Sequence, residues 1–313
     1  MKNKNIVVTG GAGFIGSNLV WRLSSDNQVT VIDNLSTGYL KNIQKLINEE
    51  KIRFVQGSIC DLNLVQDVFL DIDVVFHQAA IPSVPRSVND PVGSNQANVN
   101  GTLNVLIAAR DNKVQKVMYA SSSSVYGDSP TLPKHENMKP NPLSPYAVSK
   151  LTGEYYCKVF TEVFDLKTVS LRYFNVFGPR QDPTSEYAAV IPKFIKLIAQ
   201  GKSPVIYGDG EQSRDFTFID NVVDANIKAA EHSEVTGVFN AAYGSKMTVN
   251  TLVKELMHRI GRKVEIVYES PRPGDIKHSF SDSSKAKEAF GFDPTVSITK
   301  GLEETIKWFL KKE

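Results

Sequence analysis

The feature that most constrains the fold of this chain is a glycine-rich turn directly after its first apolar segment. Residues 6–8 are continuously apolar, which is typical of a strand buried on both faces of a parallel sheet. The turn over residues 9–16 follows at once, and an amphipathic helical pattern continues through Leu23. Without side chains, the backbone of such a turn can approach a pyrophosphate, whose negative charge the helix N-terminus favours. The glycines that fit two related dinucleotide-binding patterns are Gly10 or Gly11, Gly13 and Gly16.

An acidic residue follows at the distance that a dinucleotide site requires. The second predicted strand, residues 29–32, ends in Asp33, which lies 20 positions after Gly13. A carboxylate at this place holds the ribose 2′-hydroxyl of NAD, and it would repel the 2′-phosphate of NADP. The sequence therefore predicts an NAD site rather than an isolated glycine pattern.

Strand and helix patterns alternate through the first half of the chain. Further strands are predicted at 53–56, 74–77, 116–120 and 168–172, with helices near 94–111 and 146–164. This alternation predicts an α/β protein with a Rossmann-type, doubly wound parallel sheet. Cofactor contacts are expected at the carboxyl ends of the strands. The residues at these ends are Asp33, Asn34, Ser58, Ile59, Gln78, Ala79, Ala80, Ile81 and Ser121 to Ser124.

Tyr146 and Lys150 are four positions apart in a predicted helix, so their side chains share one face. A free phenol ionises near pH ~10. A positive charge at roughly 4 Å and an effective dielectric constant of ~20 is worth about 4 kcal/mol, which would lower the phenol pKa by about three. Tyr146 is therefore a candidate general base. The alternative is an ordinary amphipathic helix with a solvated lysine, and the glycine turn and the serine-rich strand end favour the catalytic interpretation.

The second half of the chain differs from the first in its residue pattern. Residues 173–180 are aromatic, polar and turn-rich, a helix is predicted at 188–200, and 238–241 has the pattern of another buried strand. We therefore expect an NAD-binding domain over residues 1–175, rejoined by about 220–245, and a smaller α/β substrate domain over 176–313. Helices are also expected at 248–260 and 298–310, the latter for packing. Arg214 and Arg272 lie in loops, where they could bind a phosphate or form surface ion pairs with Asp215 and Asp275.

The composition gives no reason to expect several classes of partner. The chain has 313 residues, with 36 basic and 34 acidic side chains, so its net charge of +2 gives no reason to expect nucleic acid or a membrane. The two cysteines, Cys60 and Cys157, form no Cys-x-x-Cys motif, and the five histidines are scattered. We expect no disulfide framework and no metal site, in keeping with a reducing cytoplasm. No stretch reaches the ~18 apolar residues of a membrane helix.

Taken in order, these motifs resemble those of the extended short-chain dehydrogenase/reductases, and specifically of nucleotide-sugar 4-epimerases. The resemblance spans residues 5–310. The stretches most similar to UDP-N-acetylglucosamine 4-epimerases are Leu-Ser-Pro-Tyr-Ala-Val-Ser-Lys at 143–150, Arg-Tyr-Phe-Asn-Val-Phe-Gly at 172–178, Gln-Asp-Pro at 181–183 and Tyr-Ala-Ala-Val-Ile-Pro-Lys at 187–193.

The resemblance implies a role for each matching residue. Tyr146 would be the catalytic base and Lys150 its electrostatic partner, while Ser122, assisted by Ser123, would hydrogen-bond the reacting sugar oxygen. The implied NAD contacts are Gly10, Gly13, Phe14, Ile15, Gly16, Asp33, Asn34, Ser36, Gly38, Ser58, Ile59, Gln78, Ala79, Ala80, Asn98, Tyr146, Lys150 and Phe174. The implied UDP-sugar contacts are Ser122, Ser123, Asn175, Ala189, Val190, Tyr207, Arg214, Arg272, Asp275 and Ser279.

Three positions depart from the pattern of similar proteins. Relatives usually carry an aspartate near the adenine where this chain has Ser58, and the glucose epimerases have an aromatic residue and a glycine within residues 78–80. Bacterial glucose-type epimerases carry a tyrosine at the sugar pocket where this chain has Ser279. The smaller side chain would leave room for an N-acetyl group at the second carbon of the sugar.

The activity implied is NAD-dependent interconversion of UDP-N-acetylglucosamine and UDP-N-acetylgalactosamine, and also of UDP-glucose and UDP-galactose. Tyr146 would take the proton of the 4-hydroxyl while hydride passes to NAD, and the 4-keto sugar would turn before the hydride returns. The 4,6-dehydratases need an Asp-Glu pair where this chain has Ser123-Ser124. UDP-glucuronate 4-epimerases would have a threonine at Asn175, and a non-catalytic NAD-binding protein would lose Tyr146 and Lys150.

The resemblance also implies a homodimer, in which helices near 100–112 and 146–163 form a four-helix bundle across a twofold axis. The apolar residues involved could equally belong to the internal core. They are Leu103, Leu106, Ile107, Tyr155 and Val159.

Overall fold

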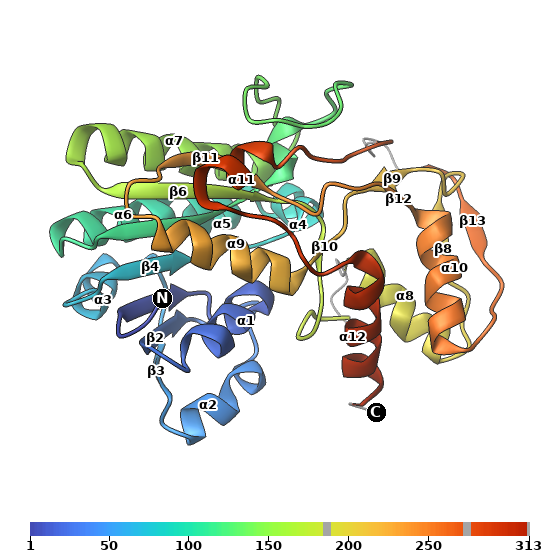
Figure 1. Cartoon of the computed structure of the whole chain (residues 1–313), viewed down its shortest axis with the longest axis horizontal. Coiled ribbons are helices and arrows are strands. Elements are labelled where there is room, and N and C mark those ends of the chain that lie inside the picture. The colour runs from blue at the N-terminus through green and yellow to red at the C-terminus, as the bar shows by residue number, and fades with distance from the viewer. Residues whose placement is uncertain (184–188, 272–276, 312–313) are drawn as a thin grey trace.

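The computed structural model describes residues 1–183, 189–271 and 277–311. Its centre is a seven-stranded sheet in the order β11-β6-β5-β4-β1-β2-β3, in which every neighbouring pair is parallel (Figure 1). The strands of this sheet are β1 Asn5–Thr9, β2 Gln28–Asp33, β3 Ile52–Gln56, β4 Val74–His77, β5 Lys116–Ser122, β6 Lys167–Tyr173 and β11 Gly237–Ala241. The predicted doubly wound α/β fold is confirmed.

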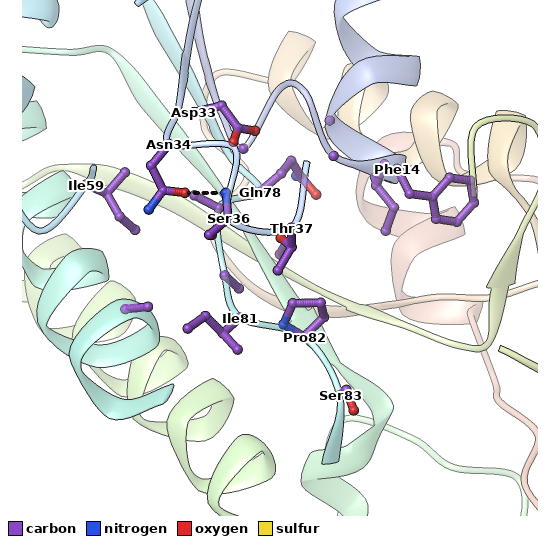
Figure 2. A pocket seen from close by; sticks show the side chains of 18 of the residues that line it. Phe14, Asp33, Asn34, Ser36, Thr37, Ile59, Gln78, Ile81, Pro82 and Ser83 are labelled. Atoms are coloured by element: carbon purple, nitrogen blue, oxygen red, sulfur yellow. Dashed lines mark hydrogen bonds between the residues drawn. The ribbon is translucent and has the colours of Figure 1, made fainter. Parts of the chain in front are cut away.

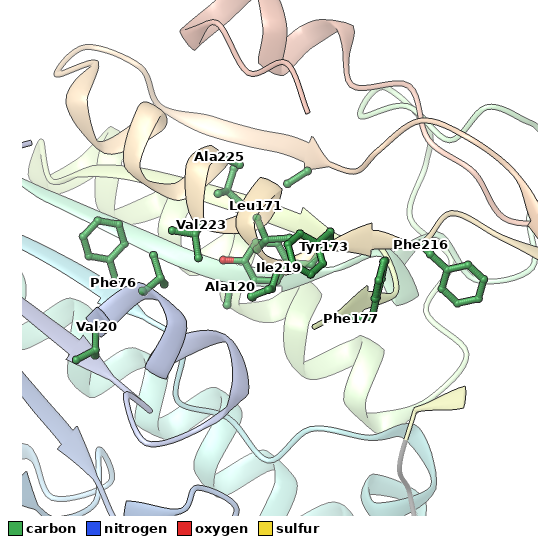
Figure 3. Packing of buried hydrophobic residues seen from close by; sticks show 14 of the residues in the cluster. Val20, Phe76, Ala120, Leu171, Tyr173, Phe177, Phe216, Ile219, Val223 and Ala225 are labelled. Atoms are coloured by element: carbon green, nitrogen blue, oxygen red, sulfur yellow. The ribbon is translucent and has the colours of Figure 1, made fainter. Parts of the chain in front are cut away.

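Helices cover both faces of the sheet, which explains the unbroken apolar runs at 6–8 in β1 and 74–76 in β4. In β1 the side chains of Ile6 and Val8 pack with α1 and α9 on one face, and Val7 packs with α3, α6 and α7 on the other. Figure 3 shows the first of these cores, where Val20 of α1 and Val223 of α9 lie with Phe76 of β4. The helices are α1 Phe14–Leu23, α2 Gln44–Asn48, α3 Leu62–Val68, α4 Val84–Asn89, α5 Pro91–Asn95, α6 Gly101–Asp111, α7 Pro145–Phe164, α8 Val190–Ala199, α9 Ile219–Glu231, α10 Val249–Ile260, α11 Ser284–Phe290 and α12 Ile298–Leu310.

Most of the second half forms a separate group of elements beside the sheet (right in Figure 1), in which helices α8, α10 and α12 pack together. Three two-stranded pairs complete it, β7 with β10, β9 with β12 and β8 with β13. Their bounds are β7 Val176–Phe177, β8 Val205–Tyr207, β9 Ser213–Arg214, β10 Thr217–Phe218, β12 Met247–Thr248 and β13 Val267–Glu269.

The chain returns to the first sheet within this half. Helix α9 packs on β5 and β6, and β11 adds to the edge of the sheet by pairing with β6. The expected strand at 238–241 is therefore present. The exact division into two domains at residue 175 remains a prediction.

The predicted helix at 94–111 is interrupted. It consists of α5, a π-helical turn over Gln96–Asn100 and α6. A π turn inside an α-helix redirects side chains and is often found at functional sites. Here it carries Asn98, whose side chain binds the loop after β4, as described below.

Among the helices of the described ranges, none is long and apolar enough to cross a membrane. In the same residues no group of three or more histidine, cysteine or acidic side chains is placed to hold a metal ion.

Candidate active site

A cavity of about 750 Å³ lies where the strands of the central sheet end (Figure 2). The chain runs from β1 outward to β2 and β3, and then returns to the other side of β1 as β4. The ligands of doubly wound sheets bind at this point, where the strand order reverses. The predicted cofactor residues that line the cavity are Gly10, Gly13, Phe14, Ile15, Gly16, Asp33, Asn34, Ser36, Ser58, Ile59, Gln78, Ala79, Ala80, Tyr146 and Lys150.

The glycine turn is packed too tightly for larger residues. Gly10 has φ +70°, a left-handed conformation that glycine adopts without strain. A Cβ atom at Gly16 would lie 2.2 Å from the carbonyl oxygen of Gly10. The turn therefore brings bare backbone to the cavity at the N-terminus of α1, which fits the pyrophosphate of a dinucleotide.

Asp33 ends β2 at the rim of the same cavity (Figure 2). Its carboxylate oxygens accept hydrogen bonds from the backbone N–H groups of Ala12 at 2.9 Å and Leu35 at 2.8 Å. Burial raises the pKa of Asp33 above its usual value, and these two donors lower it. The contact with Ala12 ties the acid to the glycine turn, so both groups expected to hold NAD are parts of one rigid unit.

Three expected cofactor residues lie outside the cavity lining that the described residues form. They are Gly38, Asn98 and Phe174. The side chain of Asn98 accepts from the N–H of Ile81 at 2.7 Å and donates to its carbonyl oxygen at 3.1 Å, so it fixes the loop that lines the cavity. Phe174 is fully buried against Tyr126 and packs in a small separate core.

The helix that carries Tyr146 begins where its sequence predicts. The hydroxyl of Ser144 accepts from the N–H of Ala147 at 3.1 Å, and Pro145 occupies the first turn, where a missing N–H costs nothing. The N–H of Tyr146 donates to the hydroxyl of Ser87 in α4 at 3.0 Å. Tyr146 and Lys150 both face the glycine-lined cavity.

The ammonium group of Lys150 lies 5.9 Å from the centre of the Tyr146 ring. It donates to the carbonyl oxygen of Ala120, at the end of β5, at 2.8 Å. Burial lowers the pKa of Lys150 to about 8. The lysine therefore still carries most of its charge at neutral pH, and it is fixed by the sheet as well as by its own helix.

The expected lowering of the Tyr146 pKa is not what the structure gives. Burial of the phenol raises its pKa above the usual value, and a hydrogen bond with Ser122 lowers it. Desolvation penalises the charged form of a buried acid. Desolvation of the phenol therefore outweighs the attraction expected of an ammonium at roughly 4 Å, and the phenol in the protein alone is less acidic than we predicted.

The four serines at 121–124, two at the end of β5 and two directly after it, make different contacts. Ser121 lines the cavity, and its hydroxyl donates to the carboxylate of Glu154. The hydroxyl of Ser122 accepts from the N–H of Ser124 at 3.2 Å, and it also reaches Tyr146. Ser123 begins the short helical turn Ser123–Tyr126. Ser122 is thus the serine that contacts the phenol. Among the described residues, neither Ser122 nor Ser123 lines either of the two cavities, so their expected contact with the sugar stays a prediction.

A second cavity of about 300 Å³ adjoins the first. Ala189 lines both, so the two cavities share a wall. The predicted substrate residues around the second cavity are Asn175, Ala189, Val190, Tyr207 and Arg214. Ser279 is half-buried and donates its N–H to Ser213. Arg272 and Asp275 lie outside the described residues.

Asp215 is buried, which rules out a solvent-exposed ion pair at this carboxylate. Its carboxylate accepts from the N–H groups of Gly244 and Ser281, each at about 3.1 Å. It therefore joins three segments next to the second cavity. Burial raises its pKa to about 7, against the lowering effect of the backbone donors.

This raised pKa predicts a pH-dependent stability term. Between about pH 4 and pH 7 the folded state keeps the Asp215 proton that the unfolded chain has lost, so rising pH destabilises the fold by up to about 4 kcal/mol. Buried His77, with its pKa lowered to about 3, acts in the opposite direction as pH falls below 6.5.

The comparison must therefore be between the wild type and Asp215→Asn, since both contain His77. Urea unfolding is expected to show that the variant gains stability relative to the wild type as pH rises from 4 to 8. Parallel pH profiles for the two proteins would contradict the assignment.

Sequence reasoning missed several residues at the site, because they are brought together only by the fold. The hydroxyl of Tyr39 donates to Asp182 at 2.8 Å, and both residues line the first cavity. The side chain of Gln78 donates to the hydroxyl of Tyr173 at 3.1 Å, and that hydroxyl donates to Asn226 of α9 at 3.0 Å. No local motif signals these contacts.

The fold and the cavity together define a dinucleotide-binding enzyme with a buried lysine beside a half-buried tyrosine and serine. Residues 6–242 match the model of the NAD dependent epimerase/dehydratase family. The chain is 38% identical to the UDP-glucose 4-epimerase of Mycolicibacterium smegmatis, with 98% of each chain covered. The chain therefore belongs to the NAD dependent epimerase/dehydratase family.

Two solved structures are also similar over their full length. One is a UDP-N-acetylglucosamine 4-epimerase from Methanobrevibacter ruminantium in complex with UDP-N-acetylmuramic acid, with 46% identity, a TM-score of 0.97 and 100% of both chains covered. The other is the UDP-glucose 4-epimerase of Thermus thermophilus in complex with NAD, with 35% identity, a TM-score of 0.89, and 98% and 99% of the chains covered. The predicted family, NAD cofactor and isomerase class are confirmed.

Proposed function

We propose that this chain is a UDP-sugar 4-epimerase that interconverts UDP-N-acetylglucosamine and UDP-N-acetylgalactosamine, and also UDP-glucose and UDP-galactose. The observation that carries the proposal is that Tyr146 and Lys150 both line the cavity beside a glycine turn that fits NAD, while Ser122 contacts the Tyr146 phenol. The adjoining cavity lined by Asn175 and Arg214 gives a UDP group a place to bind. The similarity to UDP-sugar epimerases over the whole chain supports the same assignment.

The mechanism assigns the proton to Tyr146. The glycine turn and Asp33 would hold NAD, which would supply a reversible hydride acceptor for the fourth carbon of the sugar. Tyr146 Oη takes the proton of the 4-hydroxyl as that carbon is oxidised and gives it back on reduction. The hydrogen bond from Ser122 favours the phenolate, and the charge of Lys150 acts in the same direction across a buried site.

Inversion requires that the sugar turn while the nucleotide stays fixed. Arg214 is positioned at the second cavity, where its guanidinium can bind a diphosphate. Asn175, Ala189 and Val190 border the same space, and we assign Tyr207, Arg272 and Asp275 to the nucleotide as well. Binding energy held in the UDP part leaves the hexose free to present either face of its fourth carbon.

Ser279 is proposed to admit the N-acetyl group. Replacing it with tyrosine adds an aromatic ring to the space that the N-acetyl group would need. We expect the ratio of kcat/KM for N-acetylated to plain UDP-hexoses to fall by roughly 10- to 100-fold, the range by which enzymes discriminate substrates that differ by one methylene group. Kinetics with both substrate pairs check this result. Ser283→Tyr, four residues further along the same segment, is a size-matched control that should leave the ratio unchanged. Unaltered turnover of the N-acetylated substrates in Ser279→Tyr would refute the proposal that Ser279 admits the N-acetyl group.

A panel of substrates tests the function itself. Purified protein is expected to convert UDP-N-acetylglucosamine to its galacto isomer without added reductant, and to accept UDP-glucose. Conversion of UDP-glucuronate alone would instead identify a uronate epimerase.

We further propose that the enzyme acts in the cytoplasm, which is consistent with the two free thiols, Cys60 and Cys157.

We also propose a homodimer through α6 and α7. Tyr155 is 57% and Val159 44% exposed, so a row of apolar side chains on α7 faces outward. Leu103 and Ile107 of α6 are half-buried, whereas Leu106 belongs to the internal core. Sedimentation should give a dimer, and Val159→Asp should shift it toward monomer. A wild type that sediments as a monomer at micromolar concentration would contradict this proposal.

A further inference from the structure

A third residue on the catalytic face of α7 contacts the same strand end as Tyr146 and Lys150. Glu154 follows Lys150 by four positions, as Lys150 follows Tyr146, so the three side chains form one row along the helix. Each reaches the end of β5. Tyr146 bonds to Ser122, the Lys150 ammonium donates to the Ala120 carbonyl oxygen, and the Glu154 carboxylate accepts from the Ser121 hydroxyl.

The carboxylate of Glu154 is also paired with a buried arginine. Arg172 of β6 donates to its two oxygens from Nε at 2.8 Å and Nη2 at 2.7 Å. The two side chains are only 3% and 4% exposed. The guanidinium lies 4.6 Å from the ring centre of Tyr126, whose hydroxyl donates to Asn240 of β11 at 2.7 Å. One carboxylate thus joins α7 to β5 and β6, and through Arg172 to the segment after β5.

Stability alone does not call for this arrangement. A buried ion pair can often be replaced by apolar residues of similar volume at little cost, because desolvation of both charges offsets their attraction. The ion pair instead fixes geometry, because the bidentate contact and the hydrogen bond with Ser121 hold their atoms at defined distances, which apolar packing does not. The two elements that it holds together are α7, which carries Tyr146, and β5, which carries Ser122.

We propose that Glu154 is a positioning residue, which holds Ser121 and thereby keeps the adjacent Ser122 hydroxyl within hydrogen-bonding reach of the Tyr146 phenol. This inference rests on the proposed epimerase function. A displacement of about 1 Å in a catalytic site can cost roughly 100-fold in rate. Loss of the Ser121 contact should therefore reduce kcat, while the groups that bind UDP, in the second cavity, stay in place.

Two double variants separate positioning from stability. Glu154→Gln with Arg172→Met removes both charges and keeps a side-chain oxygen for the Ser121 hydroxyl to bind. Glu154→Met with Arg172→Met removes the charges and that oxygen too. The two proteins have similar core volumes and no buried charge at this place, so they are expected to unfold at similar temperatures.

The prediction is a difference in kcat between these matched proteins. The variant with glutamine at 154 should retain most of the wild-type kcat. The variant with methionine at 154 should have a kcat about 100-fold lower than that, while the KM values of the two variants differ by less than about threefold. A purely structural role for the ion pair predicts the same kcat in both. Equal kcat values would overturn the proposal.

A second measurement does not depend on turnover. The pKa of Tyr146 can be followed by near-ultraviolet absorbance, with the same protein carrying Tyr146→Phe subtracted. Since the Ser122 hydrogen bond lowers this pKa, the variant with methionine at 154 should titrate at higher pH than the variant with glutamine at 154. If the wild type epimerises no UDP-sugar, the proposed function fails, and this titration still decides the positioning role, because identical pKa values in both variants would refute it.

Discussion

Replacing Tyr146 with phenylalanine is expected to lower kcat by about 1,000-fold, within the range that positioned acid–base groups contribute. The change removes one hydroxyl from a half-buried side chain and keeps the ring, so the cavity retains its shape. The proton of the sugar 4-hydroxyl would then have no acceptor at the reacting position. Steady-state kinetics with UDP-N-acetylglucosamine, together with calorimetric binding of NAD and of UDP, measure the effect.

The loss should appear in kcat, with NAD and UDP affinities changed by less than roughly threefold, since neither ligand's binding depends on the proton transfer. Tyr156→Phe on the same helix is the matched control, because Tyr156 packs against the core on the far side of the sheet from α1 and does not line the cavity that the described residues form. Substantial activity in Tyr146→Phe would refute the role of the phenol.

Replacing Gly16 with alanine is expected to disrupt the cofactor site itself. The added Cβ would lie 2.2 Å from the Gly10 carbonyl oxygen and 2.9 Å from the Gly11 Cα atom, so backbone must move. Overpacking of this kind costs about 1–3 kcal/mol. If the complex with NAD carries this cost, NAD binding weakens by roughly 10- to 100-fold. Isothermal titration with NAD and thermal unfolding without it measure both consequences.

Gly13→Ala provides the internal comparison for this turn. Its Cβ would have a single close neighbour, the Gly10 carbonyl oxygen at 3.2 Å. The thermal stability of the free protein should therefore fall less in Gly13→Ala than in Gly16→Ala. Equal stability of Gly16→Ala and the wild type would show that the turn is less constrained than its geometry indicates.

The sheet and the cofactor turn were predictable because their signals are local. The runs at 6–8 and 74–76 are apolar throughout because their strands are buried on both faces, and all seven strands of the central sheet coincide with predicted segments to within two residues at each end. The glycines and Asp33 lie within one β-α-β unit, where spacing along the chain fixes spacing in space. These features needed no knowledge of distant contacts.

The rest of the site depends on contacts between distant segments. The pairing of Tyr39 with Asp182, and of Glu154 with Ser121 and Arg172, follows only from the packed structure. Helix α9 was not predicted as a helix, because buried Asn221 and Asn226 interrupt its apolar face. The pKa of Tyr146 was misjudged for a related reason, since burial cannot be measured along a sequence.

The most direct test of the central claim is to incubate the purified protein with UDP-N-acetylglucosamine in deuterated water and to analyse the product by NMR. We expect the galacto isomer with no solvent deuterium at the fourth carbon, because the proposed reaction returns the same hydride that it removes there. Deuterium at that carbon, or no isomer from a folded protein that binds NAD, would contradict it.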